Sequence, residues 1–249
     1  MVLLRLVTTS LTNVYFELYR SGLIRTAPCS FKIRPKTRID ALLFDYTRLN
    51  FCPDAKRSIT VDNAGGKSEL SEMVSIQYFH DVMRGTDFVL EMEVEYWVDY
   101  KMVDFIVDLP IKTGGVERVG VSVTRAMKFG QKRQVPRRKK VKNAAADKVR
   151  SSTFTANDAL RLLNKKLFGL VVSRDTVVER HSFNRSILHV LCQTREIAEL
   201  CDYAYHHLLD LDSLGVSDCV EVIFTVCPNQ FVYTNKMNCA ERSSSIVVG

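Results

Sequence analysis

The chain has 249 residues, 46% of them hydrophobic, and carries a formal net charge of +7. That length suffices for one large domain or two small ones, with a core that needs no disulfide or metal for stability. No apolar run reaches the roughly 18 residues of a membrane span, and the seven cysteines show neither a CxxC pair nor a zinc-ligand spacing. We therefore expect no membrane partner, no disulfide framework and a reducing compartment.

The positive charge is confined to two segments. Residues 128–150 hold ten Lys and Arg against one Asp, and residues 1–39 hold seven against one Glu. The remaining residues hold 18 basic against 26 acidic side chains, so an acidic body carries two basic segments. This distribution indicates loops or arms that act electrostatically.

The sequence divides into three parts. Residues 1–57 form a basic N-terminal segment, which suits either a mitochondrial transit peptide or a structured arm of the domain. Residues 58–235 are expected to form the domain, and residues 236–249 a tail. Within the domain, residues 126–152 show no apolar periodicity and are expected to form an exposed basic loop.

Hydrophobic periodicity predicts helices that alternate with strands late in the chain. In chain order we expect a strand at 58–61, a helix at 68–83, strands at 88–97, 102–109 and 119–124, a helix at 155–170, a strand at 186–193, a helix at 194–211, and strands at 220–226 and 231–233. Ser68 and Thr155 are the predicted N-caps of the first two helices, and Gly114-Gly115 is a predicted turn. The order predicts an α/β fold with a mixed central sheet flanked by helices.

Polar side chains lie on two successive predicted strands. Asp104 and Asp108 share one face of the strand at 102–109, and Ser122 and Thr124 share one face of the next strand. This layout, with its αβββαβ order of elements, resembles the core of the PD-(D/E)XK (restriction-endonuclease-like) phosphodiesterases. Ser122-Val123-Thr124 stands where that superfamily has Glu-X-Lys, so the chain resembles a divergent member.

The resemblance implies a nucleic-acid-binding protein with a nuclease-like fold, and an active centre would imply Mg²⁺-dependent cleavage of DNA or RNA. In the superfamily, carboxylates hold a divalent cation that activates water, and a lysine helps to position the nucleophile. The metal ligands would here be Glu72, Glu93 and Asp104, and Lys165 or Lys166 would be the relocated lysine. Glu72, Asp104, Lys165 and Lys166 are therefore the candidate catalytic residues.

Two other interpretations stay open. Ser122 is a poor Mg²⁺ ligand because hard cations prefer carboxylate oxygen, and Thr124 cannot replace an ammonium group. The chain is then a catalytically inactive subunit that binds nucleic acid or scaffolds a complex. Alternatively, it is an interaction protein whose basic loop serves only nuclear import. For Glu93, whose strand also carries Glu91 and Glu95, the alternative to metal binding is a solvated acidic face.

The basic run at 132–142 is the strongest local signal. Seven of its eleven residues are basic and are candidate phosphate contacts, namely Lys132, Arg133, Arg137, Arg138, Lys139, Lys140 and Lys142. Arg125, at the end of its predicted strand, is a further phosphate contact or else forms a surface salt bridge. The stretch from Pro136 to Lys142 also resembles a nuclear-import signal, so we expect a nuclear protein, with the mitochondrion as the alternative.

A nucleotide cofactor is not expected. Gly65-Gly66-Lys67-Ser68 is similar to the end of a phosphate-binding loop, but Val61 stands where the full motif requires glycine. Asp62 would also place a carboxylate near the phosphates. The two glycines are therefore interpreted as a turn before the helix.

Overall fold

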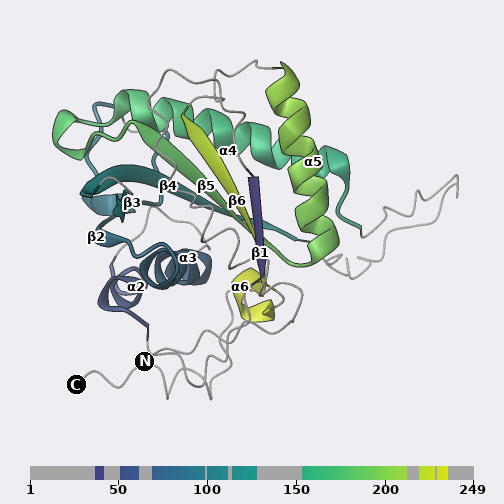
Figure 1. The fold of residues 1–249 in the computed structure, drawn as a ribbon, viewed down its shortest axis with the longest axis horizontal. Helices are drawn as coiled ribbons and strands as arrows, with labels where there is room; N and C mark the ends of the chain where they lie inside the picture. Colours follow the sequence, from purple (N-terminus) through teal and green to yellow (C-terminus); the bar gives the residue numbers. More distant parts are fainter. Residues whose placement is uncertain are drawn as a thin grey trace, which may run out of the picture.

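A computed structural model describes residues 37–41, 51–61, 69–98, 100–111, 114–127, 153–211, 219–227 and 229–234. These residues form an α/β fold in which helices flank both faces of a six-stranded mixed sheet (Figure 1). Across the sheet the strands follow the order β1-β6-β5-β4-β3-β2. The predicted fold class, α/β with a mixed sheet between helices, is confirmed.

The strands are β1 (Thr37–Ala41), β2 (Thr86–Leu90), β3 (Phe105–Pro110), β4 (Val116–Ala126), β5 (Arg185–Cys192) and β6 (Val220–Val226). The helices are α2 (Pro53–Arg57), α3 (Glu69–Asp81), α4 (Ala156–Thr176), α5 (Arg195–Leu211) and α6 (Gln230–Thr234). Strands β1, β6, β5 and β4 run parallel, whereas β3 is antiparallel to both β4 and β2. The carboxyl ends of β4, β5 and β6 therefore meet at one edge of the sheet, and β3 begins opposite Val121, before β4 ends.

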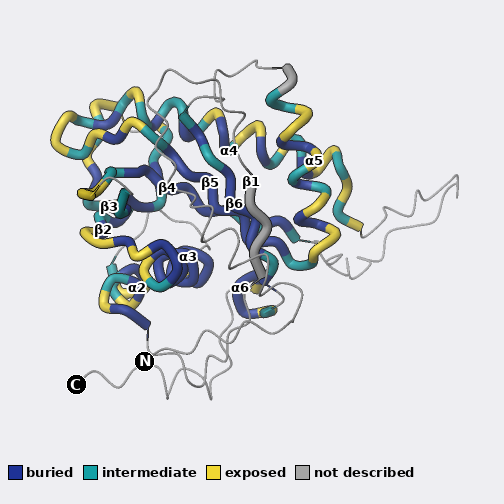
Figure 2. Tube along the Cα trace, viewed as in Figure 1, coloured by how far each residue is buried: buried dark blue, intermediate teal, exposed yellow. Residues whose placement is uncertain are grey.

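The sheet separates two hydrophobic clusters. Side chains alternate between the two faces of a strand, so Val121 and Val123 of β4 pack with α2, α3 and α6. Ala126 packs on the other face with α4 and α5. Figure 2 shows the central strands buried, with exposed positions along α4 and α5, whereas α3 is buried along most of its length.

Most predicted elements coincide with observed ones. The helices predicted at 68–83, 155–170 and 194–211 are α3, α4 and α5, and the strand predicted at 220–226 is β6. Thr155 caps α4 as expected, because its hydroxyl accepts the Asp158 N–H at 3.2 Å, but the helix continues to Thr176. The predicted glycine turn is also present, with φ angles of 85° at Gly114 and 103° at Gly115 that favour glycine.

Two predicted strands are wrong, and a third is too long. Residues 58–61 form a turn, in which the Ser58 N–H and hydroxyl donate to carbonyls of α2 at 3.0 and 2.9 Å. The strand predicted at 88–97 ends at Leu90, and Glu91–Glu93 form a short 3-10 helix in which the Glu93 carboxylate accepts the Leu90 N–H at 2.9 Å. Residues 231–233 belong to α6, where all three apolar side chains are buried.

The sheet also begins earlier than predicted. Strand β1 pairs with β6 from Thr37–Val222 to Ala41–Val226, and α2 packs against α3. Both elements lie in the predicted N-terminal segment, so the predicted boundary at residue 58 falls inside the fold. The predicted loop at 126–152 begins too early, because Ala126 is the buried last residue of β4. The predictions for residues 1–36, Ser68, the rest of that loop from residue 128 and the tail at 236–249 lie outside the described residues.

Among the helices that the structure describes, none combines the length and the apolar character needed to cross a bilayer.

Candidate functional site

Asp104 lies directly before β3, beside Ser122 and Val123 in the C-terminal half of β4. Its N–H donates to the Val121 carbonyl at 2.9 Å, which extends the β3–β4 pairing by one residue. Its Oδ2 accepts a hydrogen bond from the Ser122 hydroxyl at 2.8 Å and another from the Val123 N–H at 2.6 Å. Because β4 runs past the start of β3, the carboxylate supplies the acceptor that the next residue of a longer strand would have supplied.

Lys166 reaches this carboxylate from α4. Its Nζ lies 3.2 Å from Ser122 Oγ and 4.0 Å from Asp104 Oδ2. Lys166 stands between the buried residues Leu163 and Leu167, so helical periodicity places it at the margin of the face that packs on the sheet. Its side chain is 31% exposed and that of Asp104 is 13% exposed, so the Asp104–Ser122–Lys166 cluster meets solvent mainly through the lysine.

The hydrogen bonds of the cluster determine what it can bind. The Ser122 hydroxyl donates its one proton to Asp104 and accepts from Lys166, so both of its roles are occupied. The ammonium group of Lys166 has three N–H donors and uses one of them on Ser122. Its other donors can serve an anion that approaches from solvent, because the lysine is the most exposed member of the cluster.

The structure does not bring the predicted metal ligands together. Glu93 pairs with Arg57, and Glu72 lies on α3, on the face of the sheet opposite Lys166. In the described part of the chain, no group of three or more His, Cys, Asp and Glu side chains could hold a metal ion. Asp104 supplies a single carboxylate with one oxygen already accepting two hydrogen bonds, so the residues gathered here do not fit a two-carboxylate Mg²⁺ site.

Arg125 turns away from the cluster. It lies on the α3 side of β4, where its Nη1 donates to the carbonyls of Val232 and Tyr233 at 3.1 and 3.5 Å. Burial lowers the pKa of the Arg125 guanidinium, and the negative charge of Glu72 partly opposes that shift. These contacts tie α6 to the sheet, which neither the predicted phosphate contact nor the predicted surface salt bridge anticipated.

The structure distinguishes residues that the sequence left equivalent. Asp108 does not join Asp104 beside Ser122, because its carboxylate pairs with Arg118 at 2.9 Å. Lys165 is exposed on α4, whereas its neighbour Lys166 contacts Ser122. The basic side chains predicted to bind phosphate at 132–142 lie outside the described residues.

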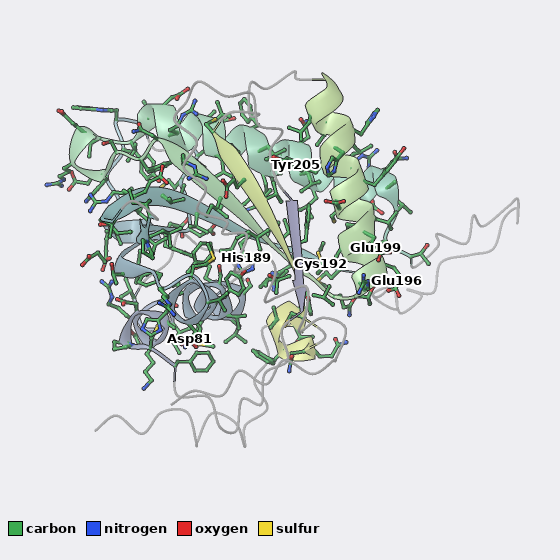
Figure 3. The ribbon with its side chains drawn as sticks, in the orientation of Figure 1. Asp81, His189, Cys192, Glu196, Glu199 and Tyr205 are labelled. Carbon is green, nitrogen blue, oxygen red and sulfur yellow. The ribbon has the colours of Figure 1, made fainter. Side chains whose placement is uncertain are left out.

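Sequence reasoning missed a buried polar chain on the α3 side of the sheet. The two ring nitrogens of His189 lie 2.7 Å from Ser75 Oγ and 2.8 Å from Thr225 Oγ1. All three side chains are fully buried, and the ring of Tyr78 lies 4.8 Å from the imidazole. Figure 3 shows His189 between the sheet and α3. The sequence signal for this feature was a polar residue at each of three otherwise apolar core positions. The hydrogen bonds among Ser75, His189 and Thr225 join α3 to β5 and β6.

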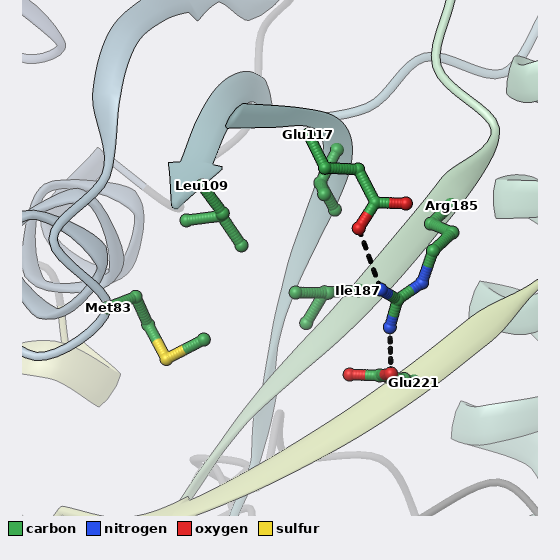
Figure 4. A pocket seen from close by; sticks show the side chains of 7 residues that line it. Met83, Leu109, Glu117, Arg185, Ile187 and Glu221 are labelled. Carbon is green, nitrogen blue, oxygen red and sulfur yellow. Dashed lines mark hydrogen bonds and ion pairs between the residues drawn. The ribbon is translucent and has the colours of Figure 1, made fainter. Parts of the chain in front are cut away.

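An ion triplet occupies the amino edge of the parallel strands. Arg185 of β5 binds Glu117 of β4 at 2.8 Å and also pairs with Glu221 of β6 (Figure 4). The pocket beside it is small and is otherwise lined by apolar side chains such as Met83 and Leu109. The triplet joins three neighbouring strands and lies at the edge opposite the Asp104–Ser122–Lys166 cluster.

The comparisons with known proteins leave the family open. No family model matches the chain, and no solved structure matches it either. Among curated proteins, the chain is similar to the AAC-rich mRNA clone AAC4 protein of Dictyostelium discoideum, with 29% identity over 150 residues. The match covers 60% of this chain and 19% of the relative, so the chain spans about a fifth of that protein's length. The name of the relative states no activity.

Proposed function

We propose that this protein binds nucleic acid through a restriction-endonuclease-like core, and that the Asp104–Ser122–Lys166 cluster contacts a backbone phosphate. The observation that carries the proposal is the approach of Lys166 Nζ to Ser122 Oγ at 3.2 Å, beside Asp104. In the superfamily that the strand pattern resembles, an acidic residue and a lysine meet at neighbouring strands. Here a helix supplies the lysine to the same carboxylate.

The order of the elements supports the proposed core. Helix α3 is followed by β2, β3 and β4, then by α4 and β5, which is the αβββαβ order of the superfamily. The antiparallel pairing of β3 with β4 puts Asp104 next to Ser122, which the proposal matches to the glutamate of Glu-X-Lys.

The chemistry of the cluster favours phosphate binding over metal-dependent cleavage. A neutral hydroxyl at Ser122 replaces the carboxylate that would share a divalent cation with Asp104. Lys166 retains donors that can pair with a phosphate oxygen as a charge-assisted hydrogen bond. The basic residues at 128–150 would add contacts that do not depend on base sequence.

Salt-dependent binding of oligonucleotides to the full chain tests the proposal. Lys166→Ala should weaken binding and lower the slope of log K against log salt by about one, because one phosphate contact is lost. Lys56→Ala is the matched control, since it removes an exposed positive charge from α2, on the opposite face of the sheet. Equal effects of the two variants, or no binding by the wild type, would contradict the proposal.

A second candidate is a metal-dependent phosphodiesterase, favoured by the same lysine. An active centre with Ser-X-Thr needs a relocated lysine near its Asp, and Lys166 Nζ lies 4.0 Å from Asp104. The binding reactions distinguish the candidates when they are incubated with Mg²⁺ or Mn²⁺. Nicking that is abolished by both Asp104→Ala and Lys166→Ala would establish cleavage, whereas the first proposal predicts binding without nicking.

A further inference from the structure

The segment between β2 and β3 presents two exposed aromatic rings. Trp97 is 76% exposed and Tyr100 is 61% exposed, although rings of this size usually bury most of their area in a folded domain. The neighbouring Val98 is exposed as well. Figure 2 includes this stretch between β2 and β3 among the exposed parts of the tube. Such rings offer apolar faces to a ligand.

Hydrogen bonds fix the backbone of this segment against α4. The Trp97 N–H donates to the Thr176 carbonyl at 2.8 Å, and Tyr96 forms an antiparallel bridge with Val177. The Tyr96 hydroxyl oxygen accepts the Val103 N–H at 2.9 Å, directly before Asp104. Trp97 therefore extends from backbone that is hydrogen-bonded to α4, which reduces the entropy lost when a ligand binds its ring.

The segment follows α4 toward the Asp104–Ser122–Lys166 cluster. Trp97 is anchored at Thr176, and Lys101 lies over Gly169, where an added Cβ would meet its Cδ at 3.9 Å. Lys166 precedes Thr176 by about ten residues, which is about 15 Å along the helix at 1.5 Å per residue. A single strand that lies along α4 could therefore contact Trp97 and Lys166 at the same time.

Lysines lie near the rings, although the segment that carries the rings also holds Glu91, Glu93, Glu95 and Asp99. Two of these carboxylates are paired, Glu93 with Arg57 and Glu95 with Arg180. Lys101 Nζ lies 4.9 Å from the centre of the Tyr100 ring, and Lys165 and Lys166 stand on the adjoining helix. Lysines near aromatic rings suit a single strand, because lysines pair with phosphates while unstacked bases stack on the rings. A duplex hides the faces of its bases and would engage the lysines alone.

We infer that the nucleic acid bound at this site is single-stranded, with bases stacked on Trp97 and Tyr100 and a phosphate against Lys166. The inference rests on the proposed function, since it names the strand form that the same site takes.

The fluorescence of Trp97 gives a direct test, because it is the single tryptophan of the chain. Titration of the full chain with a single-stranded oligonucleotide should quench the emission in a saturable way, since a base stacks on the indole. The duplex of the same sequence, added to equal occupancy, should leave the emission nearly unchanged. Bound single strand without quenching would overturn the inference.

Substitutions test the same contact by affinity. Trp97→Ala and Tyr100→Ala should each weaken single-strand binding roughly fivefold or more and leave duplex binding unchanged. Trp97→Phe should retain most of the affinity because it keeps an aromatic face. Tyr203→Ala is the matched control, since it removes a ring that is 68% exposed on α5.

The ratio of single-strand to duplex affinity isolates the ring contacts, because phosphate contacts act on both strand forms. If Trp97→Ala binds both forms as the wild type does, the inference fails and the proposed function stands. The exposed rings would then be assigned to a protein partner. If the wild type binds neither strand form, the proposed function fails, and the inference fails with it.

Discussion

At the scale of single residues, Asp104 combines a structural contact with a place in the candidate site. Its carboxylate accepts the Val123 N–H at the point where β4 extends beyond the start of β3. The side chain therefore satisfies a backbone donor whether or not a ligand is bound. Ser122 then connects the carboxylate to Lys166. The cluster thus holds the lysine in place through groups that are satisfied within the protein.

Arg125 provides a prediction at this scale. Arg125→Gln should lower the free energy of unfolding by about 1–3 kcal/mol, because a charged donor to two carbonyls of α6 is lost. Affinity for oligonucleotides should stay at the wild-type value, because the side chain lies on the face of the sheet opposite Lys166. Urea denaturation and binding titrations measure the two effects. Normal stability with weakened binding would instead support the prediction from the sequence that Arg125 contacts phosphate.

Strand alternation was sufficient to predict that Asp104 could lie beside Ser122. It could not choose between Asp104 and Asp108, because that choice depends on the register of β3 against β4. Nor could it choose Lys166 over Lys165, since the choice depends on how α4 rotates when its apolar face packs on the sheet. Both decisions are made by tertiary packing.

At the scale of elements, the apolar runs were predicted well and the mixed segments poorly. Strand β6 reads as a short apolar run, and its predicted bounds match. The stretch at 88–97, which alternates apolar and acidic residues, leaves the sheet after Leu90. There the Glu93 carboxylate accepts the Leu90 N–H and pairs with Arg57, a residue that is distant in the sequence. Local periodicity cannot reveal such a partner.

Helix α4 carries Lys166, and its N-terminal cap gives a prediction that depends on pH. Hydrogen bonds from Thr155 lower the pKa of Asp158, so the ionised carboxylate stabilises the folded state. That contribution is present above the unfolded pKa of about 4 and is lost as the pH falls through the lower folded value. Thr155→Ala should therefore lower the free energy of unfolding by about 1 kcal/mol at pH 7.

The difference between Thr155→Ala and the wild type should shrink in acid, because the carboxylate that receives the Thr155 hydrogen bonds becomes protonated. Urea denaturation at pH 7 and at pH 3 measures the change. A difference that is the same at both pH values would show that the carboxylate contributes nothing to the cap.

At the scale of the whole molecule, the sheet topology places the candidate site. Strand β3 runs antiparallel to β4 and begins opposite Val121, so Asp104 meets Ser122 and Val123 in the C-terminal half of β4. The sequence predicted the order of these elements but not the pairing of β1 with β6. The two strands are far apart in the sequence. Strand β1 also lies in a basic segment whose charge favoured the interpretation that it precedes the domain.

The contact between Lys166 and nucleic acid is the central claim, and footprinting of lysines tests it most directly. The rate of amine acylation at each lysine can be measured by mass spectrometry, with and without saturating oligonucleotide. Lys56 is an exposed lysine of α2, on the opposite side of the sheet, and serves as the internal control. We predict that Lys166 is protected while Lys56 keeps its reactivity. Unchanged acylation of Lys166 in the bound complex would contradict the proposed site.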